Sequence, residues 1–276
     1  MQRKVVFLRL NAQLPLVGVA IFPILPNNMK NFFVFFAAFT LFAATLLLSG
    51  CTEETEDITL EYGYAYFPID SGHWIIYAVD SVIYSTFLSG GVDTVSLQIK
   101  EVFTNPFTDN EGRPAITIER YARYADTIAW DKLIPTVWYA AKNNQKAERK
   151  EGELRYLNMV FPALQGTKWM GNAYINTNQD ATAVFANWQY TYTEVDVPKT
   201  MGTLSFSQTA TIVQNDYEDL VNKIYSREVY AKNVGMIEKE RWLLQLGTND
   251  ITSPLPWPQR AQRGTLVKMR VIDYKQ

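Results

Sequence analysis

The chain of 276 residues has a single cysteine, Cys51, and a single histidine, His73. A zinc site of Cys and His ligands and a disulfide framework both need more such residues, so the sequence excludes both. An excess of positive charge is also missing, because 26 Lys and Arg stand against 28 Asp and Glu. This balance argues against a dedicated nucleic-acid binder, which needs basic residues to neutralise phosphates. The 47% of apolar residues are enough to fill a core.

Charge is absent from one long stretch near the start. Residues 32–48 are seventeen uncharged residues, FFVFFAAFTLFAATLLL, and they follow Lys30. A short basic start, an apolar run and small residues before a break are typical of a secretory signal peptide, here residues 29–50. An uncleaved transmembrane anchor is the alternative, although seventeen residues is at the short end for a membrane span.

The residues after this run make the prediction more specific. Leu48, Ser49, Gly50 and Cys51 resemble the bacterial lipobox. The resemblance implies that the thiol of Cys51 receives a diacylglyceryl group and that the preceding peptide is then removed. Acyl chains contribute ~0.8 kcal/mol per buried CH₂, so they could hold a soluble domain on a bilayer.

Residues 1–28 look like a second, poorer export signal, interrupted by Pro15, Pro23 and Pro26. Our hypothesis is that Met29 is the true start and that residues 1–28 are an over-called upstream extension.

The chain from Cys51 onward carries 22 basic and 28 acidic residues. Four of its acids lie within residues 52–57, in a segment 51–61 that we interpret as an acidic tether. The tether also resembles the acidic tract that directs lipoproteins of Bacteroidota to the outer face of the outer membrane. Both interpretations place the protein in the bacterial cell envelope, anchored to the outer membrane and facing the periplasm or the surface.

Residues 62–276 show a period of two. Trp188, Tyr190 and Tyr192 alternate with polar residues, and Val95, Leu97 and Ile99 do the same. This alternation predicts antiparallel strands with one buried face. We therefore predict a single all-β domain, in which one mostly antiparallel curved sheet forms an open barrel or a sandwich.

Turn residues divide this domain into about ten strands. We place them near residues 73–84, 92–103, 114–124, 134–142, 153–160, 168–175, 184–195, 203–213, 224–231, 236–246 and 264–274, of which one is doubtful. A short helix is expected at 216–222, and the proline cluster 253–258 is expected to connect the last two strands.

Two segments are similar to a family of uncharacterised secreted lipoproteins of Bacteroidota. Residues 66–77, YFPIDSGHWIIY, resemble the family's "YFPL…G..W.Y" opening, and residues 228–240, EVYAKNVGMIEKE, resemble its "YAKNVGLI..E" hairpin. The resemblance implies an exported β-rich domain and no established activity. Gly235, in the second segment, is expected at a tight turn with positive φ.

Four aromatic residues are candidates for ligand contact. Trp188, Tyr190 and Tyr192 would fill the core of a sandwich, but in a curved half-barrel they would line a groove for an acyl chain or a sugar ring. Trp257 stands between two prolines, and we expect it to be exposed and to contact a partner.

No motif predicts catalysis, a metal site or a cofactor. His73 is more simply a packed or surface side chain than a catalytic base. We interpret Glu238, Glu240 and Arg241, around Lys239, as a solvated strand face with cross-strand ion pairs. Paired carboxylates of a glycosidase could occur among 28 acids without any motif.

The sequence therefore predicts a non-catalytic lipoprotein of the cell envelope, a ligand-binding or assembly module held by acylated Cys51. Its expected partners are the membrane, through the lipid, and a hydrophobic ligand, a glycan or an envelope protein, but no nucleic acid. The alternative is a hydrolase that acts on envelope glycans through paired carboxylates.

Replacing the acylated thiol tests the anchor. Cys51→Ser removes the sulfur that would carry the lipid, so we expect the variant to lose incorporation of labelled palmitate and to leave the membrane fraction. The wild-type chain, expressed in parallel, should be labelled and sediment with membranes. An unlabelled wild-type chain would contradict the lipoprotein assignment.

Overall fold

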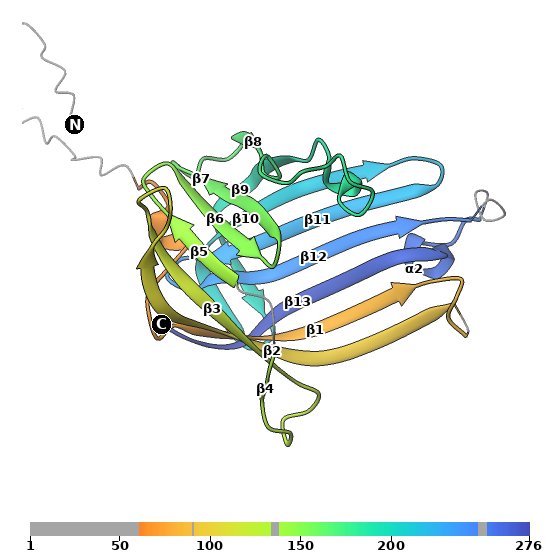
Figure 1. Cartoon of the computed structure of the whole chain (residues 1–276), viewed down its shortest axis with the longest axis horizontal. Coiled ribbons are helices and arrows are strands. Elements are labelled where there is room, and N and C mark those ends of the chain that lie inside the picture. The colour runs from red at the N-terminus through yellow and green to blue at the C-terminus, as the bar shows by residue number, and fades with distance from the viewer. Residues whose placement is uncertain (1–60, 90, 134–137, 248–252) are drawn as a thin grey trace, which may run out of the picture. The chain divides into compact units, whose positions relative to one another are not determined.

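The segments in which apolar and polar residues alternate form one large antiparallel sheet. The structure, a computed structural model, describes residues 61–89, 91–133, 138–247 and 253–276, all within the unit Thr59–Gln276. The predictions for residues 1–28, the signal peptide, the lipobox and Cys51 lie outside these ranges, as does most of the tether. Figure 1 shows the course of the strands.

The described residues form thirteen strands. They are β1 (Trp74–Tyr84), β2 (Val92–Thr108), β3 (Pro114–Arg123), β4 (Asp131–Lys132), β5 (Trp138–Lys142), β6 (Lys146–Glu151), β7 (Leu154–Val160), β8 (Lys168–Met170), β9 (Gln189–Met201), β10 (Leu204–Glu218), β11 (Asn222–Ala231), β12 (Gly235–Gln245) and β13 (Arg263–Lys275). Three short helices accompany them, namely η2 (Tyr64–Tyr66), η3 (Ala183–Phe185) and α2 (Trp257–Arg260).

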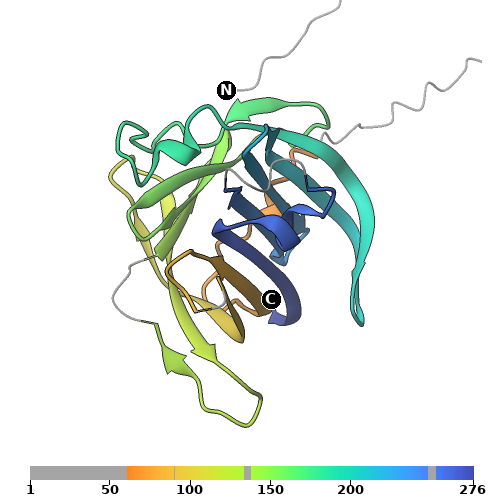
Figure 2. The ribbon, with the colours of Figure 1, turned by 90° about the vertical axis from the view of Figure 1, so that its right-hand side faces the viewer.

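Every strand pairs antiparallel with its neighbours, in the order β7-β6-β5-β3-β2-β1-β13-β12-β11-β10-β9-β8, and β4 adds to β3. The two ends of this order meet, because the backbone N–H of Leu157 in β7 donates to the carbonyl oxygen of Gly171 just after β8, at 2.8 Å. The sheet is thus a nearly closed barrel (Figure 2), which confirms the predicted all-β, antiparallel fold.

Aromatic side chains fill much of the interior. Trp188, Tyr190 and Tyr192 are at most 1% exposed, and their polar atoms bond to neighbouring segments. Of the two interpretations of this stripe, the structure shows the core, not an open groove. His73 is also buried, and its Nε2 lies 2.9 Å from the carbonyl oxygen of Val234.

Trp257 is buried, so the expectation that it is exposed is wrong. Helix α2 turns its ring onto the end of the barrel, where it packs with Tyr84, Leu244 and Leu266 and is only 7% exposed. Its indole N–H donates to Glu218 at 2.8 Å.

Other expectations about local structure also differ from the fold. The helix expected at 216–222 is the end of β10 and a turn, in which the Asp219 carboxylate accepts bonds from the N–H groups of Val221 and Asn222. Strand β6 was not expected at all. The turn at Gly235 is confirmed, with a φ of 92°.

One glycine is required by close packing between central strands. Gly264 has a φ of +117° and pairs with both Tyr84 and Leu244. A Cβ atom there would lie 1.8 Å from the carbonyl oxygen of Leu243. We expect Gly264→Ala to lower the free energy of unfolding by roughly 2–4 kcal/mol.

Gly202 offers a matched control, because its φ is also positive (+59°) but a Cβ would meet nothing within 4 Å. Gly202→Ala should cost about 1 kcal/mol. Urea unfolding followed by tryptophan fluorescence measures both variants, and equal losses would contradict the steric argument.

Candidate functional site: a charged cavity inside the sheet

Strand β12 carries charged residues on both faces. On the outer face, Glu238 pairs with Arg227 at 2.8 Å and Glu240 with Lys268 at 3.1 Å. Lys239 and Arg241 alternate with them and therefore point into the barrel. The predicted cross-strand ion pairs are present at the two glutamates, although their side chains are only 14% and 16% exposed, and the prediction is wrong for Arg241.

The inner charged side chains form a chain of ion pairs that begins on β2 and β3. The carboxylate of Glu101, fully buried, accepts from Arg120 Nε at 3.2 Å and from Arg149 Nη2 at 2.5 Å. Both guanidinium groups lie over the ring of Trp138, at 3.8 Å and 5.0 Å from its centroid. The planar, delocalised guanidinium suits such stacking.

The chain of ion pairs continues across the barrel to β12 and β11. Glu151 lies 3.3 Å from Arg149 Nε and 3.2 Å from Lys239 Nζ. Lys239 also contacts Glu228 at 3.1 Å, and Glu228 accepts a bond of 2.6 Å from the hydroxyl of Tyr230. Positive and negative groups thus alternate through six side chains, in the order Arg120, Glu101, Arg149, Glu151, Lys239, Glu228.

These neighbours keep the buried acids ionised. Burial alone would raise the pKa of Glu151, but Lys239 and Arg149 outweigh it and lower the pKa to about 2. The pKa of Glu228 is also lowered, since Lys239 outweighs the burial of that carboxyl. Both acids are therefore anions at neutral pH.

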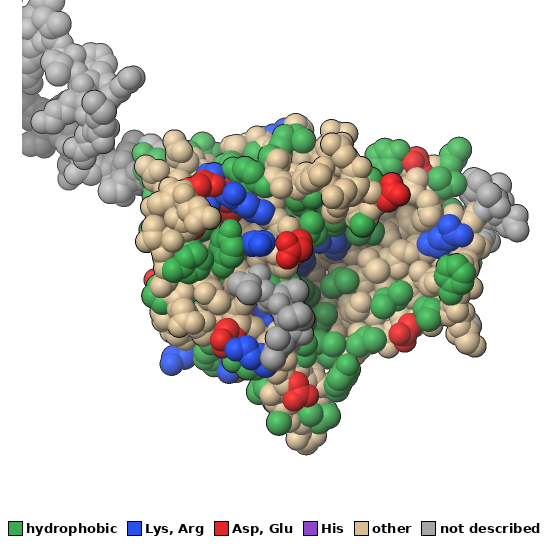
Figure 3. All heavy atoms as spheres, viewed as in Figure 1, with side chains coloured by type: hydrophobic (Ala, Val, Ile, Leu, Met, Phe, Trp, Pro, Cys, Tyr) green, Lys and Arg blue, Asp and Glu red, His purple; other side chains and the backbone are tan. Residues whose placement is uncertain are grey.

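A cavity of about 170 Å³ lies among these residues. Six charged side chains line it together with Trp138, Met236, Val267 and Met269, and they are Glu101, Arg120, Arg149, Glu151, Lys239 and Arg241. Figure 3 shows a hollow near the middle of one face, over β12 and β13, with basic side chains inside it and an acidic side chain at its rim.

Arg241 differs from the other cations of the cavity. In the part of the chain that the structure describes, it has no carboxylate partner. Its polar contacts are long, 3.4 Å from Nε to the Ser226 hydroxyl and 3.5 Å from Nη1 to the Tyr156 hydroxyl. Nη2 is buried and has no hydrogen-bond partner. The guanidinium rests against aromatic rings, including that of Trp188 at 5.8 Å.

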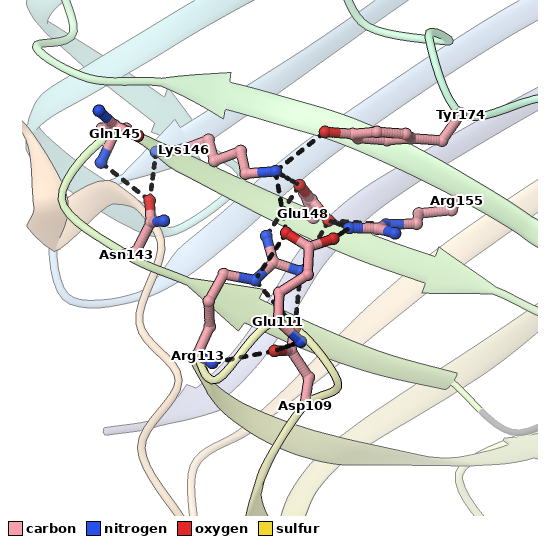
Figure 4. Close-up of polar contacts among 9 residues, drawn as sticks. All are labelled: Asp109, Glu111, Arg113, Asn143, Gln145, Lys146, Glu148, Arg155 and Tyr174. Atoms are coloured by element: carbon pink, nitrogen blue, oxygen red, sulfur yellow. Dashed lines mark hydrogen bonds and ion pairs between the residues drawn. The ribbon is translucent and has the colours of Figure 1, made fainter.

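A second ionic cluster lies on the other face of β6 (Figure 4). The carboxylate of Glu148 receives Arg113 at 2.8 Å, Lys146 at 2.6 Å and Arg155 at 2.5 Å. Asp109 and Glu111, in the turn between β2 and β3, pair with the same cations. Three acids thus balance three bases, and the cluster ties this turn to the β6–β7 hairpin.

Neither cluster was expected from the sequence. None of the four aromatic candidates lines the cavity, although Trp188 packs behind Arg241. Among the described residues, no group of three or more His, Cys, Asp or Glu side chains could hold a metal ion. No helix in the described ranges combines the length and the apolar character needed to cross a membrane.

The chain matches no family model and no curated protein. One solved structure aligns with it, that of a Bacteroides fragilis protein assumed to be exported, which has a YmcC-like fold. The two chains share 10% sequence identity with a TM-score of 0.39, and the alignment covers 76% of this chain and 98% of the other.

The second cluster predicts a pH-dependent contribution to stability. Arg113, Lys146 and Arg155 outweigh the effect of burial and lower the pKa of Glu148 from 4.5 to about 2. This stabilisation is complete above pH 4.5, where Glu148 is ionised in both the folded and the unfolded chain. It is lost as the pH falls toward 2, because the unfolded chain then binds a proton that the folded chain does not. Glu148→Gln leaves the three cations without their shared anion, and should cost about 3 kcal/mol at pH 7.

The difference between wild type and Glu148→Gln should shrink as the pH falls from 4.5 to 2. Glu153→Gln is the matched control, because Glu153 is exposed two residues beyond β6, and its cost should stay within about 0.5 kcal/mol. Urea unfolding at a series of pH values measures both. A pH-independent cost for Glu148→Gln would show that charge is not the cause.

Proposed function

We propose that this chain is a lipoprotein of the bacterial outer membrane, anchored by acylated Cys51, whose barrel is a non-catalytic module that binds a ligand in its inner cavity. The signal-like run and the lipobox-like residues 48–51 support the envelope location. The charged cavity carries the proposal of ligand binding.

The composition of the cavity supports a binding role over a purely structural one. Buried ion pairs contribute little to stability, because removing charges from water offsets most of their attraction, and apolar residues of similar volume are often as good or better. Seven charged side chains inside this barrel are therefore better explained by recognition than by stability.

The same residues argue against two of the functions expected from the sequence. An acyl chain could lie against Trp138, Met236, Val267 and Met269, but it would leave Arg120, Glu151 and Lys239 beside apolar surface, so the cavity favours a ligand that also carries polar groups. The burial of Trp257 also removes the aromatic contact on which partner binding at the surface depended.

A glycan hydrolase is also less well supported. Its general acid must hold a proton near neutral pH, which requires a raised pKa. The cavity acid Glu151 and its neighbour Glu228 instead have lowered pKa values, and each is paired with Lys239. These carboxylates balance the cations of the cavity, which is a binding role.

The volume limits the size of the ligand. Pockets for drug-sized ligands occupy roughly 300–1,000 Å³. A cavity of about 170 Å³ would hold a smaller polar molecule, or one end of a larger one such as a glycan.

Native mass spectrometry of the full chain, extracted from the membranes of its own host in mild detergent, tests this function. We expect a mass in addition to the polypeptide and its acyl chains, and we expect denaturation to release it. Val267→Phe should abolish the added mass, because the larger ring fills the cavity that Val267 lines.

Ile272→Phe is the matched control, since Ile272 lies on the same strand but is 42% exposed. It should retain the added mass. Circular dichroism confirms that both variants are folded. A wild-type chain without any bound molecule, or equal occupancy in the two variants, would contradict binding in the cavity.

A further inference from the structure

The charged side chains that line the cavity, taken together with Glu228 beside them, are unequal in number. Glu101, Glu151 and Glu228 are the acids of the alternating chain, and Arg120, Arg149 and Lys239 match them one to one. Arg241 is the seventh charged group. The set therefore carries a net charge of +1, and that charge belongs to Arg241.

The positive charge of Arg241 cannot be removed by deprotonation. Burial alone would lower its pKa, but Tyr156 and Glu151 outweigh that effect and raise the pKa above the ordinary value for arginine. A buried guanidinium that no carboxylate contacts directly, with one nitrogen lacking a hydrogen-bond partner, carries an uncompensated desolvation cost. A bound anion would offset this cost.

The geometry of the guanidinium suits a carboxylate. Nη2 has no acceptor, and the contact of Nη1 with Tyr156 is at the limit of a hydrogen bond. Two adjacent N–H donors with free or weak partners match the two oxygens of a carboxylate, which guanidinium groups bind in a bidentate manner. A net charge of +1 balances a monoanion, whereas a dianion would meet repulsion from the nearby Glu151.

The rest of the lining suits a hydroxylated molecule. Arg120 and Lys239 supply donors, and Glu151 supplies acceptor oxygens that keep some exposure. Trp138, Val267 and Met269 supply apolar surface beside them. A ring with hydroxyl groups at its edge and C–H groups on its faces presents both kinds of surface.

We infer that the ligand of the cavity is a small hydroxylated carboxylate, of the size of one sugar acid, and that Arg241 binds its carboxylate. This inference rests on the proposed function, because it names the ligand class for the same cavity.

Three sugars of one ring size and different charge test the inference. Isothermal titration calorimetry of the full chain in detergent compares glucuronate, glucose and glucosamine, which are an anion, a neutral molecule and a cation. We expect glucuronate to bind at least about tenfold more tightly than glucose, and glucosamine to bind most weakly.

A variant that removes a positive charge and one that removes a negative charge should change the affinity for glucuronate in opposite directions. Arg241→Gln keeps hydrogen-bond donors but removes the charge, and should abolish the preference for glucuronate over glucose. Glu151→Gln raises the net charge of these seven side chains from +1 to +2 and should strengthen glucuronate binding by about threefold to tenfold. A gain of affinity cannot arise from misfolding.

Arg227→Gln is the control, because Arg227 pairs with Glu238 on the outer face of the sheet. This variant should leave the preference unchanged.

The native mass measurement separates the failure of this inference from the failure of the proposed function. A co-purified anion that Arg241→Gln no longer retains supports the inference, even if glucuronate itself binds weakly. A co-purified neutral or cationic molecule, or equal affinity for glucose and glucuronate, overturns the inference and leaves the binding function. No co-purified molecule, together with no binding of any of the three sugars, overturns both.

Discussion

The pairing of β1 with β13 is the constraint on which the rest of the structure depends. All other strand pairs join segments that are close in the sequence, whereas Trp74 to Tyr84 pair with the last strand of the chain. This contact joins a sheet of β2, β3 and β5–β7 to a sheet of β8–β12. Since Glu101 and Arg149 come from the first group and Lys239 and Arg241 from the second, this long-range pairing brings the two sides of the cavity together.

The interior combines two solutions to the problem of filling a barrel. Toward β8 and β9, aromatic rings pack against one another, and the hydroxyl and indole groups of Trp188, Tyr190 and Tyr192 bond to nearby segments. Toward β2, β6 and β12, the interior is filled by charged side chains and not by aromatic rings. Trp138 and Trp188 lie at the boundary, because each ring packs on one side against guanidinium groups of the charged region.

The period of two was enough to predict the fold, because apolar side chains mark one face of most strands. It failed for β6, whose sequence KAERKE has charges on both faces and therefore shows no alternation. The inner charges of β12 were only partly accessible to the same rule. Parity puts Lys239 and Arg241 on one face together, but the register shift at Ile237 breaks the alternation with the preceding apolar residues, so parity did not show which face is buried. The closure of the cavity depends on contacts between distant strands, which no local pattern contains.

Because charges of opposite sign alternate along β12, the charge of the cavity depends on the register of this strand. Glu238 and Glu240 occupy one face, and Lys239 and Arg241 occupy the other. If one residue were gained or lost ahead of them within the strand, every side chain would change faces. The barrel would then enclose two additional anions in place of two cations, so the sign of the charge that this protein can accommodate depends on the register of β12 as much as on the identity of any residue.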